Sequence, residues 1–329
     1  MSSEAPRWVK HGLVYAPDGR MPWARHSAMT PTPILRDDGT VRVYAGFRDE
    51  RGVSRIGYVD IEPAPPFKVV AVCKAPALDV GRPGCFDDNG VILGDILRFP
   101  DRLEMFYIGF QIAEQVKFLS FTGKAVSTDG GEHFERVSEA PVLDRTDTGL
   151  YFRAIHSVLI EDGIYRAWCG AGSEWVTIDG RTYPKYSVWY SQSRDGVHFA
   201  TPDRLCIELA GDEYRIGRPR VYRQGDGYCM YFTKGDLRGN YVVGYAESPD
   251  GLAWQRRDEL VGIGPSPSGW DSQMLCYPSL INAGGRMLMV YNGNGMGRDG
   301  FGIAELAVSP DHSLAASSTE GRALAAQGK

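Results

Sequence analysis

The chain has 329 residues, of which 43% are hydrophobic, 11% aromatic and 23% charged. This composition is typical of a globular protein with a sizeable core, and the 40 glycines and 20 prolines indicate many turns. The net charge of −5 gives no general attraction to nucleic acid or to an anionic membrane surface, so we expect neither as a partner.

The first residues lack the apolar stretch of a secretion signal, and no run approaches the roughly 20 apolar residues of a membrane helix. The six cysteines form no C-x-x-C pair and most lie in strand-like runs, which favours reduced thiols packed in a core. We therefore expect a cytoplasmic protein. No spacing of ligand-type residues is typical of a metal site, so we expect neither a metal nor another cofactor.

Short β-rich runs separated by turn residues follow one another along the whole chain. Residues 8–15 are predicted to form a strand that precedes the first repeated unit. Residues 31–35 and 41–47 flank an Asp-Gly turn, which is a strong hairpin signal, and the later units repeat this plan. No helical periodicity persists for more than a turn or two.

A polar or proline-containing segment leads into an apolar run at five places. Anchored at positions 31, 89, 156, 218 and 277, these segments are separated by 58, 67, 62 and 59 residues. Self-similarity at such a period is the sequence sign of a propeller or another array of repeated units. We therefore predict an all-β fold, a five-bladed β-propeller in a single domain.

The predicted propeller covers residues 1–308, with blades over about 26–61, 84–137, 151–202, 214–258 and 270–308. The strand over residues 8–15 is expected to complete the last blade and close the ring. From residue 309 the chain becomes small and polar, so residues 309–329 are predicted to be a disordered tail.

Three of the predicted blades end in one local phrase, Ser-x-Asp-Gly followed by an aromatic residue. It occurs at Ser127–Phe134, Ser193–Phe199 and Ser248–Trp254. The Asp side chain can accept hydrogen bonds within its own turn, and Gly supplies a positive φ. We interpret these turns as structural, which places His133 and His198 at the rim of the molecule, away from any site.

The functional site is predicted where the innermost strands begin, because those strand starts converge on the axis of a propeller. The candidates are carboxylates, cations, an amide and aromatic residues: Arg48, Asp87, Asp88, Arg153, His156, Glu174, Trp175, Arg218, Asp271, Tyr277 and Asn292. This mixture suits a polyhydroxylated ligand, so the expected partner is an oligosaccharide or other small molecule, with an anionic ligand among the options.

Asp87 and Asp88 are adjacent carboxylates, and their repulsion would raise the pKa of one of them and make it a usable acid. The alternative is that either residue caps a turn. His156 is either a satisfied core histidine or an acid, base or anion ligand. Arg153 and Arg218 either bind an anionic group or form structural ion pairs with Asp87 or Asp271.

Four segments resemble a known superfamily: Phe86–Val91, Gly217–Pro219, Trp270–Pro278 and Tyr291–Gly295. Together with the Ser-x-Asp-Gly turns they are similar to the five-bladed glycosidase superfamily of arabinanases, β-xylosidases, fructosidases and mannoside phosphorylases. The resemblance spans about residues 25–307 and is closest to glycosidase-like propellers of sugar and polysaccharide pathways. It implies a glycoside hydrolase or phosphorylase-like enzyme of carbohydrate metabolism.

The chain departs from this superfamily at three positions. Arabinanase-like members carry Asp, Asp and Glu where this chain has Thr30, His156 and Arg218. The mannoside phosphorylases carry Glu-Asp-Pro-Arg where this chain has Asp87-Asp88-Asn89-Gly90, which places Asp88 in the position of the general acid.

The resemblance thus implies an enzyme that cleaves or transfers a glycosyl group, with Asp88 as acid and with Asp87 or Glu174 assisting. Arg153, His156 and Arg218 would hold an anionic group, and the remaining candidates would contact the sugar. One alternative is a sugar-binding propeller that has lost catalysis. Another is a non-hydrolytic isomerase, cyclase or lyase acting on a small metabolite.

Overall fold

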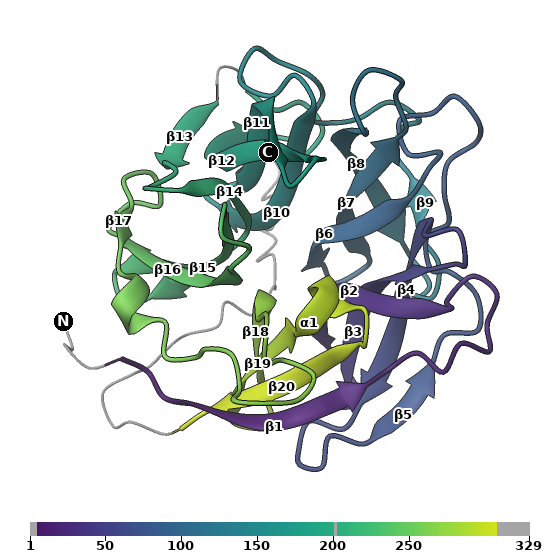
Figure 1. Cartoon of the computed structure of the whole chain (residues 1–329). Helices are drawn as coiled ribbons and strands as arrows, with labels where there is room; N and C mark the ends of the chain where they lie inside the picture. The colour runs from purple at the N-terminus through teal and green to yellow at the C-terminus, as the bar shows by residue number, and fades with distance from the viewer. Residues whose placement is uncertain (1–4, 201–202, 308–329) are drawn as a thin grey trace, which may run out of the picture.

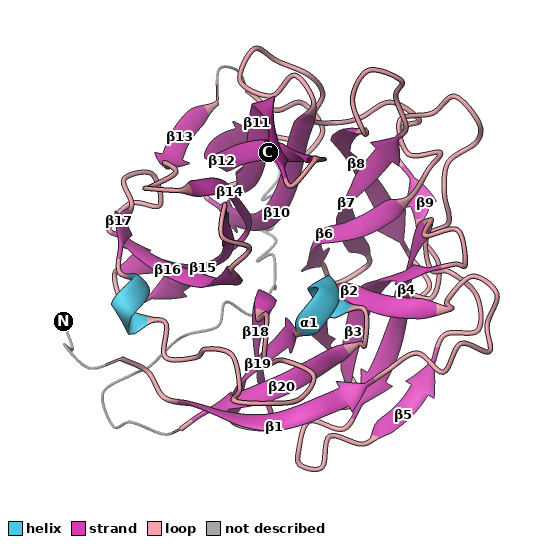
Figure 2. Cartoon of the chain, in the orientation of Figure 1, coloured by secondary structure: helices cyan, strands magenta, loops and turns pink. Residues whose placement is uncertain are grey.

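The computed structural model describes residues 5–200 and 203–307, so the predicted tail over 309–329 lies outside the described residues. The described chain is almost entirely β, with a 3₁₀ turn at Asp258–Leu260 and the short helix α1 at Asn294–Gly297 (Figure 2). No helix in these ranges has the length and apolar character needed to cross a membrane.

Antiparallel pairing of neighbouring strands divides the sheet structure into groups of four, arranged around a common centre in Figure 1. Group I is β2 (His26–Leu35), β3 (Val41–Arg48), β4 (Ser54–Ile61) and β5 (Val69–Val72). Group II is β6 (Val91–Arg98), β7 (Leu103–Gln111), β8 (Leu119–Ser127) and β9 (Glu135–Arg136). Group III is β10 (Phe152–Glu161), β11 (Ile164–Ile178), β12 (Arg181–Ser193) and β13 (Arg204–Ile207).

Group IV is β14 (Glu213–Gln224), β15 (Gly227–Asp236), β16 (Tyr241–Ser248) and β17 (Gln255–Arg256). Group V is β18 (Cys276–Ala283), β19 (Arg286–Asn292) and β20 (Phe301–Leu306), followed by β1 (Trp8–Tyr15) from the start of the chain. β1 pairs antiparallel with β20, in a register that runs from Trp8 opposite Leu306 to Tyr15 opposite Phe301.

Short parallel contacts join groups II, III and IV into one 12-stranded sheet, while groups I and V form separate four-stranded sheets. Among the described residues, hydrogen bonds therefore do not close the groups into a single ring. The first strand of each group (β2, β6, β10, β14 or β18) nevertheless packs beside the first strand of the next. The contacts run from β2 to β6, β6 to β10, β10 to β14, β14 to β18 and β18 back to β2. The all-β, single-domain prediction is confirmed, whereas five closed blades remain a prediction.

Every first strand has a shift in its pairing with the second strand of its group. We take the residue at this shift as the repeat position of each group. The residues at the shifts are Thr30, Gly94, His156, Arg218 and Tyr277. A bulge re-aims the side chain that it displaces. In group II the repeat position is thus Gly94, and the anchor expected at Asn89 falls in the preceding turn.

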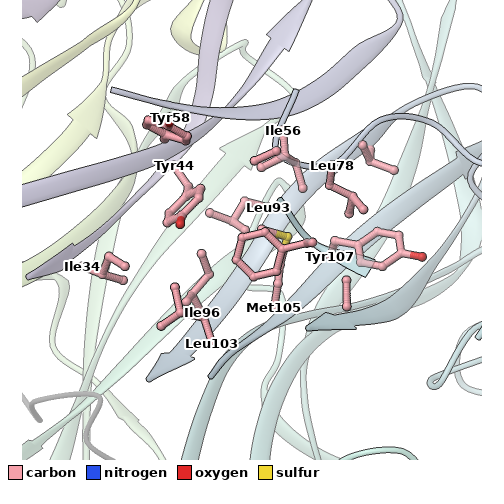
Figure 3. Close-up of a cluster of buried hydrophobic side chains, with 14 of the residues drawn as sticks. Ile34, Tyr44, Ile56, Tyr58, Leu78, Leu93, Ile96, Leu103, Met105 and Tyr107 are labelled. Atoms are coloured by element: carbon pink, nitrogen blue, oxygen red, sulfur yellow. The ribbon is translucent and has the colours of Figure 1, made fainter. Parts of the chain in front are cut away.

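The hydrophobic core lies between neighbouring groups, so each sheet buries both of its faces. Figure 3 shows the cluster between groups I and II, where Tyr44 and Ile56 face Leu93 and Met105. Equivalent clusters fill the other junctions, including the one between groups V and I. At about 25 cal/mol per Å² of buried apolar area, this packing is the main source of stability.

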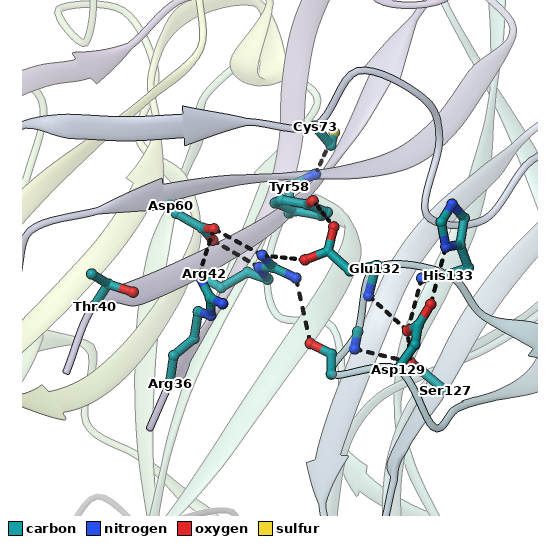
Figure 4. A network of polar contacts seen from close by, with 12 residues as sticks. Arg36, Thr40, Arg42, Tyr58, Asp60, Cys73, Ser127, Asp129, Glu132 and His133 are labelled. Atoms are coloured by element: carbon teal, nitrogen blue, oxygen red, sulfur yellow. Dashed lines mark hydrogen bonds and ion pairs between the residues drawn. The ribbon is translucent and has the colours of Figure 1, made fainter. Parts of the chain in front are cut away.

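The Ser-x-Asp-Gly turns of groups II and IV attach these groups to the ones before them. In the turn that begins at Ser127, a carbonyl group accepts a hydrogen bond from Arg42 of group I (Figure 4), and the next carbonyl accepts one from Tyr44. The turn beginning at Ser248 accepts bonds from Arg166 and Trp168 of group III in the same way. The structural interpretation of these turns is confirmed, and both turn histidines are exposed.

Candidate functional site

Arg218, on β14, donates hydrogen bonds to two of the other first strands, β6 and β2. Its guanidinium donates to the carbonyls of Leu93 and Gly94 at 2.6 and 2.7 Å, and to the carbonyl of Thr30 and the hydroxyl of Thr32 at 3.1 and 2.6 Å. Backbone geometry adds strain here, because Arg218 has a φ of 54°. We expect Arg218 to stabilise the fold by connecting β14 to β6 and β2.

Arg218 carries a buried charge that no carboxylate contacts directly. The side chain is 2% exposed, and burial followed by the charge of Arg220 lowers the pKa of Arg218 to about 9. It therefore remains protonated at neutral pH, and its Nε has no partner. A buried cation without a direct ion pair is costly, and the carbonyl and hydroxyl oxygens around Arg218 offset part of that cost.

His156 lies beside Arg218, with Nδ1 at 3.5 Å from Nη1 of the guanidinium. Burial and then the charges of Arg218 and Arg220 hold the pKa of His156 well below its ordinary value of 6.5. The imidazole is therefore neutral near pH 7. The structure brings His156 and Arg218 together as predicted, in a buried layer rather than an open pocket.

Below this layer, towards the ends of the first strands, Arg220 pairs with Asp95 at 2.5 Å. Beyond the pair lies a cavity of about 420 Å³, lined by residues of all five first strands such as Ile34, Val158 and Leu280. We call this the lower end, and the end at which the first strands begin the upper end. The two ends are separated by the Arg218 layer.

At the upper end, the Tyr277 ring packs edge-on against the Tyr241 ring, with ring centres 5.8 Å apart. Tyr241 donates a hydrogen bond to the Tyr277 hydroxyl at 3.2 Å, which leaves the Tyr277 proton free to donate. Burial raises the pKa of Tyr277, so this phenol stays neutral.

Aromatic rings form one wall of the upper end. Tyr186 stacks on Phe152 with ring centres 4.5 Å apart, and a Cβ on Gly217 would approach the Tyr186 ring to 2.6 Å. Trp175 lies on the projecting part of the β11–β12 hairpin and packs against Phe118 with ring centres 5.4 Å apart. Such faces can pack against the C–H surface of a sugar.

The two adjacent carboxylates have different surroundings. Asp87 is fully buried and accepts a hydrogen bond from Arg136 at 2.7 Å, so it is an ion-paired core residue. Asp88 is half-buried and accepts bonds from the Gly84 backbone and the Asn89 side chain, with no ion pair. No contact joins Asp88 to His156 or Arg218, and its turn borders a second cavity of about 420 Å³.

Several other candidates are held by protein partners. Arg153 forms a buried, bidentate ion pair with Asp203. It therefore has the structural role offered as an alternative, but its partner is neither Asp87 nor Asp271. Asp271 pairs with Lys10 at 2.7 Å and accepts a bond from Tyr291. Neither side chain is free to contact a ligand in this arrangement.

Asn292 is fully buried, and its amide bonds to the backbone of Thr30, Ala28 and Gly300. It links groups V and I rather than facing open space. Glu174 is exposed on the β11–β12 hairpin and pairs with Lys185 at 2.7 Å. Asn292 thus has the surroundings of a structural residue, and Glu174 those of a surface residue.

Arg215 and Tyr241 are the upper-end residues that the predicted site lacks. The sequence signal for Arg215 is its place in a Tyr-Arg pair at a strand start, two residues before the Gly-Arg-Pro segment. Tyr241 had no local signal, because its approach to Tyr277 depends on the packing of group IV against group V.

Solved structures with the same fold include proteins described as glycoside hydrolases. A glycoside hydrolase aligns with a TM-score of 0.70 at 17% identity over 94% of each chain. A structure from work on the GH130 family of mannoside phosphorylases aligns with 0.67 at 15% identity over 96% of this chain and 97% of that one. A thermostable family-43 glycoside hydrolase gives 0.65 at 14% identity, over 88% and 93% of the two chains.

These likenesses confirm the expected resemblance at the level of fold, namely the all-β, propeller-type fold of glycoside hydrolase-like proteins. No protein-family model matches the sequence. Two curated relatives, the uncharacterised proteins Rv1502 and MT1551 of two Mycobacterium tuberculosis strains, are each 36% identical over 301 residues. The match covers 91% of this chain and 99% of each relative, so the chain belongs to the family of Rv1502.

Proposed function

We propose that this chain is a carbohydrate-active enzyme that cleaves or transfers a glycosyl group at the upper end of a closed, five-bladed propeller. Support for the closed ring comes from the sequential packing of the first strands, in which β18 returns to β2. The likeness to glycoside hydrolases and to a structure from the mannoside phosphorylase family supports a sugar substrate.

The observation that carries the chemistry is the difference among the predicted carboxylates. Asp87, Asp271 and Glu174 are paired with cations, whereas Asp88 forms no ion pair with any described residue. A carboxyl group outside an ion pair is available to contact a glycosidic oxygen and to transfer a proton to it. We assign Asp88 as this general acid.

One free carboxylate favours one reaction type over another. Two-carboxylate hydrolysis requires a second residue to activate water or to attack the sugar. A transfer in which an anion attacks the anomeric carbon needs only the acid, because the anion is itself the nucleophile. The positive charge of the buried Arg218 would favour an anion in the space above it without contacting that anion directly, so we favour phosphorolysis or transfer.

The test is an assay of aryl glycosides and disaccharides, run with and without inorganic phosphate. We expect turnover in the native protein, dependent on phosphate, and none in the Asp88→Asn variant. Asp236→Asn is the matched control, because Asp236 also accepts hydrogen bonds within its own turn at the upper end. Full activity of Asp88→Asn, or equal loss in the control, would refute the assignment.

The same carboxylate pairing also favours a second candidate, a sugar-binding propeller without catalysis, because three of the four expected carboxylates are neutralised. A non-hydrolytic isomerase, cyclase or lyase would likewise need only Asp88 and the neutral His156. Saturable sugar binding with no release of product in any assay would select the binding function. A rearranged or eliminated product, formed without hydrolysis or phosphorolysis, would select the other.

A further inference from the structure

The second cavity of about 420 Å³ lies at the upper end of group II, beside the turn that carries Asp88. Its volume is within the range of about 300–1,000 Å³ that is usual for small-molecule pockets. Three segments line it: the turn before β6, the facing ends of β7 and β8, and the segment that follows β9. We call it the group II cavity.

The inner surface of the group II cavity is apolar, because a glycine lets the turn before β6 pack onto the sheet. A Cβ on Gly109 of β7 would approach the Phe86 ring to 2.6 Å. Phe121 of β8 lies opposite Gly109, and Leu119 lies opposite Gln111. Phe86 and Phe121 are buried, Leu119 is half-buried, and all three line the cavity. Such a surface can pack against the C–H face of a sugar ring.

Two planar polar side chains at the same cavity have hydrogen-bonding groups to spare. Gln111 donates to the Cys85 carbonyl at 3.5 Å, which is long for a hydrogen bond, and its amide oxygen accepts none from the described residues. The Arg145 guanidinium lies 5.7 Å from the centre of the Phe121 ring and forms no ion pair with a described residue. An amide and a guanidinium together offer donors and an acceptor to neighbouring hydroxyl groups.

The charges around the group II cavity are balanced. Its charged side chains are two arginines and two carboxylates, namely Arg82, Arg145, Glu139 and Asp144. Arg82 and Glu139 form an ion pair at 2.7 Å. A lining without net charge gives no preference for an anion, so it is better suited to a neutral ligand that carries hydroxyl groups.

The turn before β6 connects this cavity to the proposed acid. Gly84 and Cys85 line the cavity. The Gly84 N–H donates to Oδ2 of Asp88 at 2.9 Å, and the Asp88 N–H donates to the Cys85 carbonyl at 3.3 Å. The Asp88 carboxylate therefore contacts a residue of the lining directly. Arg48, by contrast, ends β3 opposite His26 and does not line this cavity.

We propose that the group II cavity binds a saccharide unit next to the bond that Asp88 protonates, so that the substrate class is an uncharged oligosaccharide. The identification of that bond rests on the proposed function. The sugar ring packs on Leu119, and its hydroxyl groups bond to Gln111 and Arg145. The chain of the substrate therefore extends over group II rather than along the axis.

A glycan array of monosaccharides, disaccharides and longer oligosaccharides tests this proposal, followed by calorimetry with the glycan that binds best. We expect disaccharides or longer chains to bind more tightly than monosaccharides. Gln111→Ala and Arg145→Met should each weaken binding by about five- to tenfold, because each removes hydrogen bonds to the sugar. No bound glycan on the array, or monosaccharides that bind as tightly as longer chains, would overturn the proposal.

Two variants at the lower end are matched controls. Gln224→Ala removes a half-buried glutamine from the end of β14, and Arg286→Met removes a positive charge that pairs with Glu305. Both should bind the glycan with native affinity, and urea denaturation should show a cooperative transition for all four variants. Equal weakening in the controls, or native affinity in Gln111→Ala and Arg145→Met, would contradict the assignment of the cavity.

The outcomes also separate this inference from the proposed function. Turnover that depends on Asp88 but is unaffected by Gln111→Ala, by Arg145→Met and by the length of the substrate would overturn the cavity assignment and leave the glycosyl chemistry standing. Oligosaccharide binding that depends on Gln111 and Arg145, without turnover of any glycoside, would support the cavity and overturn the enzymatic assignment.

Discussion

Arg42, between the sheets, and Arg215 and Arg218, towards the centre of the molecule, have different surroundings. Between groups I and II, Arg42 is enclosed by Asp60 and Glu132 (Figure 4). Arg215 contacts rings and Arg218 contacts backbone carbonyls, and neither pairs with a carboxylate of the described residues. Arg220, beside Arg218, does pair with Asp95, so a central position alone does not decide which arginines are paired.

The largest effect is expected when the buried Arg42 loses its carboxylate partner. Asp60→Ala removes the carboxylate that accepts from Arg42 and Arg36, and leaves Arg42 buried with only the partly exposed Glu132. We expect the free energy of unfolding to fall by about 3–5 kcal/mol, measured by urea denaturation. Glu139→Ala, at an exposed pair with Arg82, should produce no measurable change. Equal effects of the two variants would contradict this account.

The next effect concerns Arg218, which connects β14 to β2 and β6. In Arg218→Lys the charge remains, but a single ammonium cannot reach acceptors on β2 and β6 together. The free energy of unfolding should fall by about 2 kcal/mol. Unchanged stability would mean that the guanidinium does not connect the first strands.

The neutral histidine beside Arg218 predicts a pH dependence. Because the pKa of His156 is depressed in the folded state, the unfolded chain binds more protons below pH 6.5. Stability is therefore lost as pH falls, by about 2 kcal/mol from this residue between pH 7.5 and pH 5. His156→Gln should lack this component in denaturation curves at the two pH values. The same pH slope in both proteins would place the cause elsewhere.

The smallest effect sharpens the role of the turns. Ser193 is buried and its hydroxyl accepts from the backbone of Asp195 and Gly196. Ser193→Ala should reduce the free energy of unfolding by about 1 kcal/mol and leave ligand binding intact. Loss of binding at native stability would show that these turns contribute to function.

Local patterns were sufficient to predict the strands and the recurring turns. Residues 8–15 and 41–47 match β1 and nearly all of β3, because alternation and Asp-Gly turns depend only on neighbouring residues. The convergence of His156 with Arg218 also followed from the repeat. The repeat position in group II was misplaced at Asn89, since the bulge at Gly94 depends on pairing with β7.

The partners of the candidate residues could not be predicted, because they come from distant segments. Asp203 lies 50 residues from Arg153, and Lys10 lies 261 residues from Asp271. A single sequence shows which side chains carry charge, but only the packed sheets decide which charges neutralise each other. The pairing of Asp87, Asp271 and Glu174 with cations is a consequence of that packing.

The most direct test of the central claim is a crystal structure of the protein with the tightest-binding sugar phosphate or uronate. The account predicts the ligand at the upper end, with its glycosidic oxygen within hydrogen-bonding distance of Asp88. A ligand seated instead in the lower cavity, against Arg220 and Asp95, would contradict it.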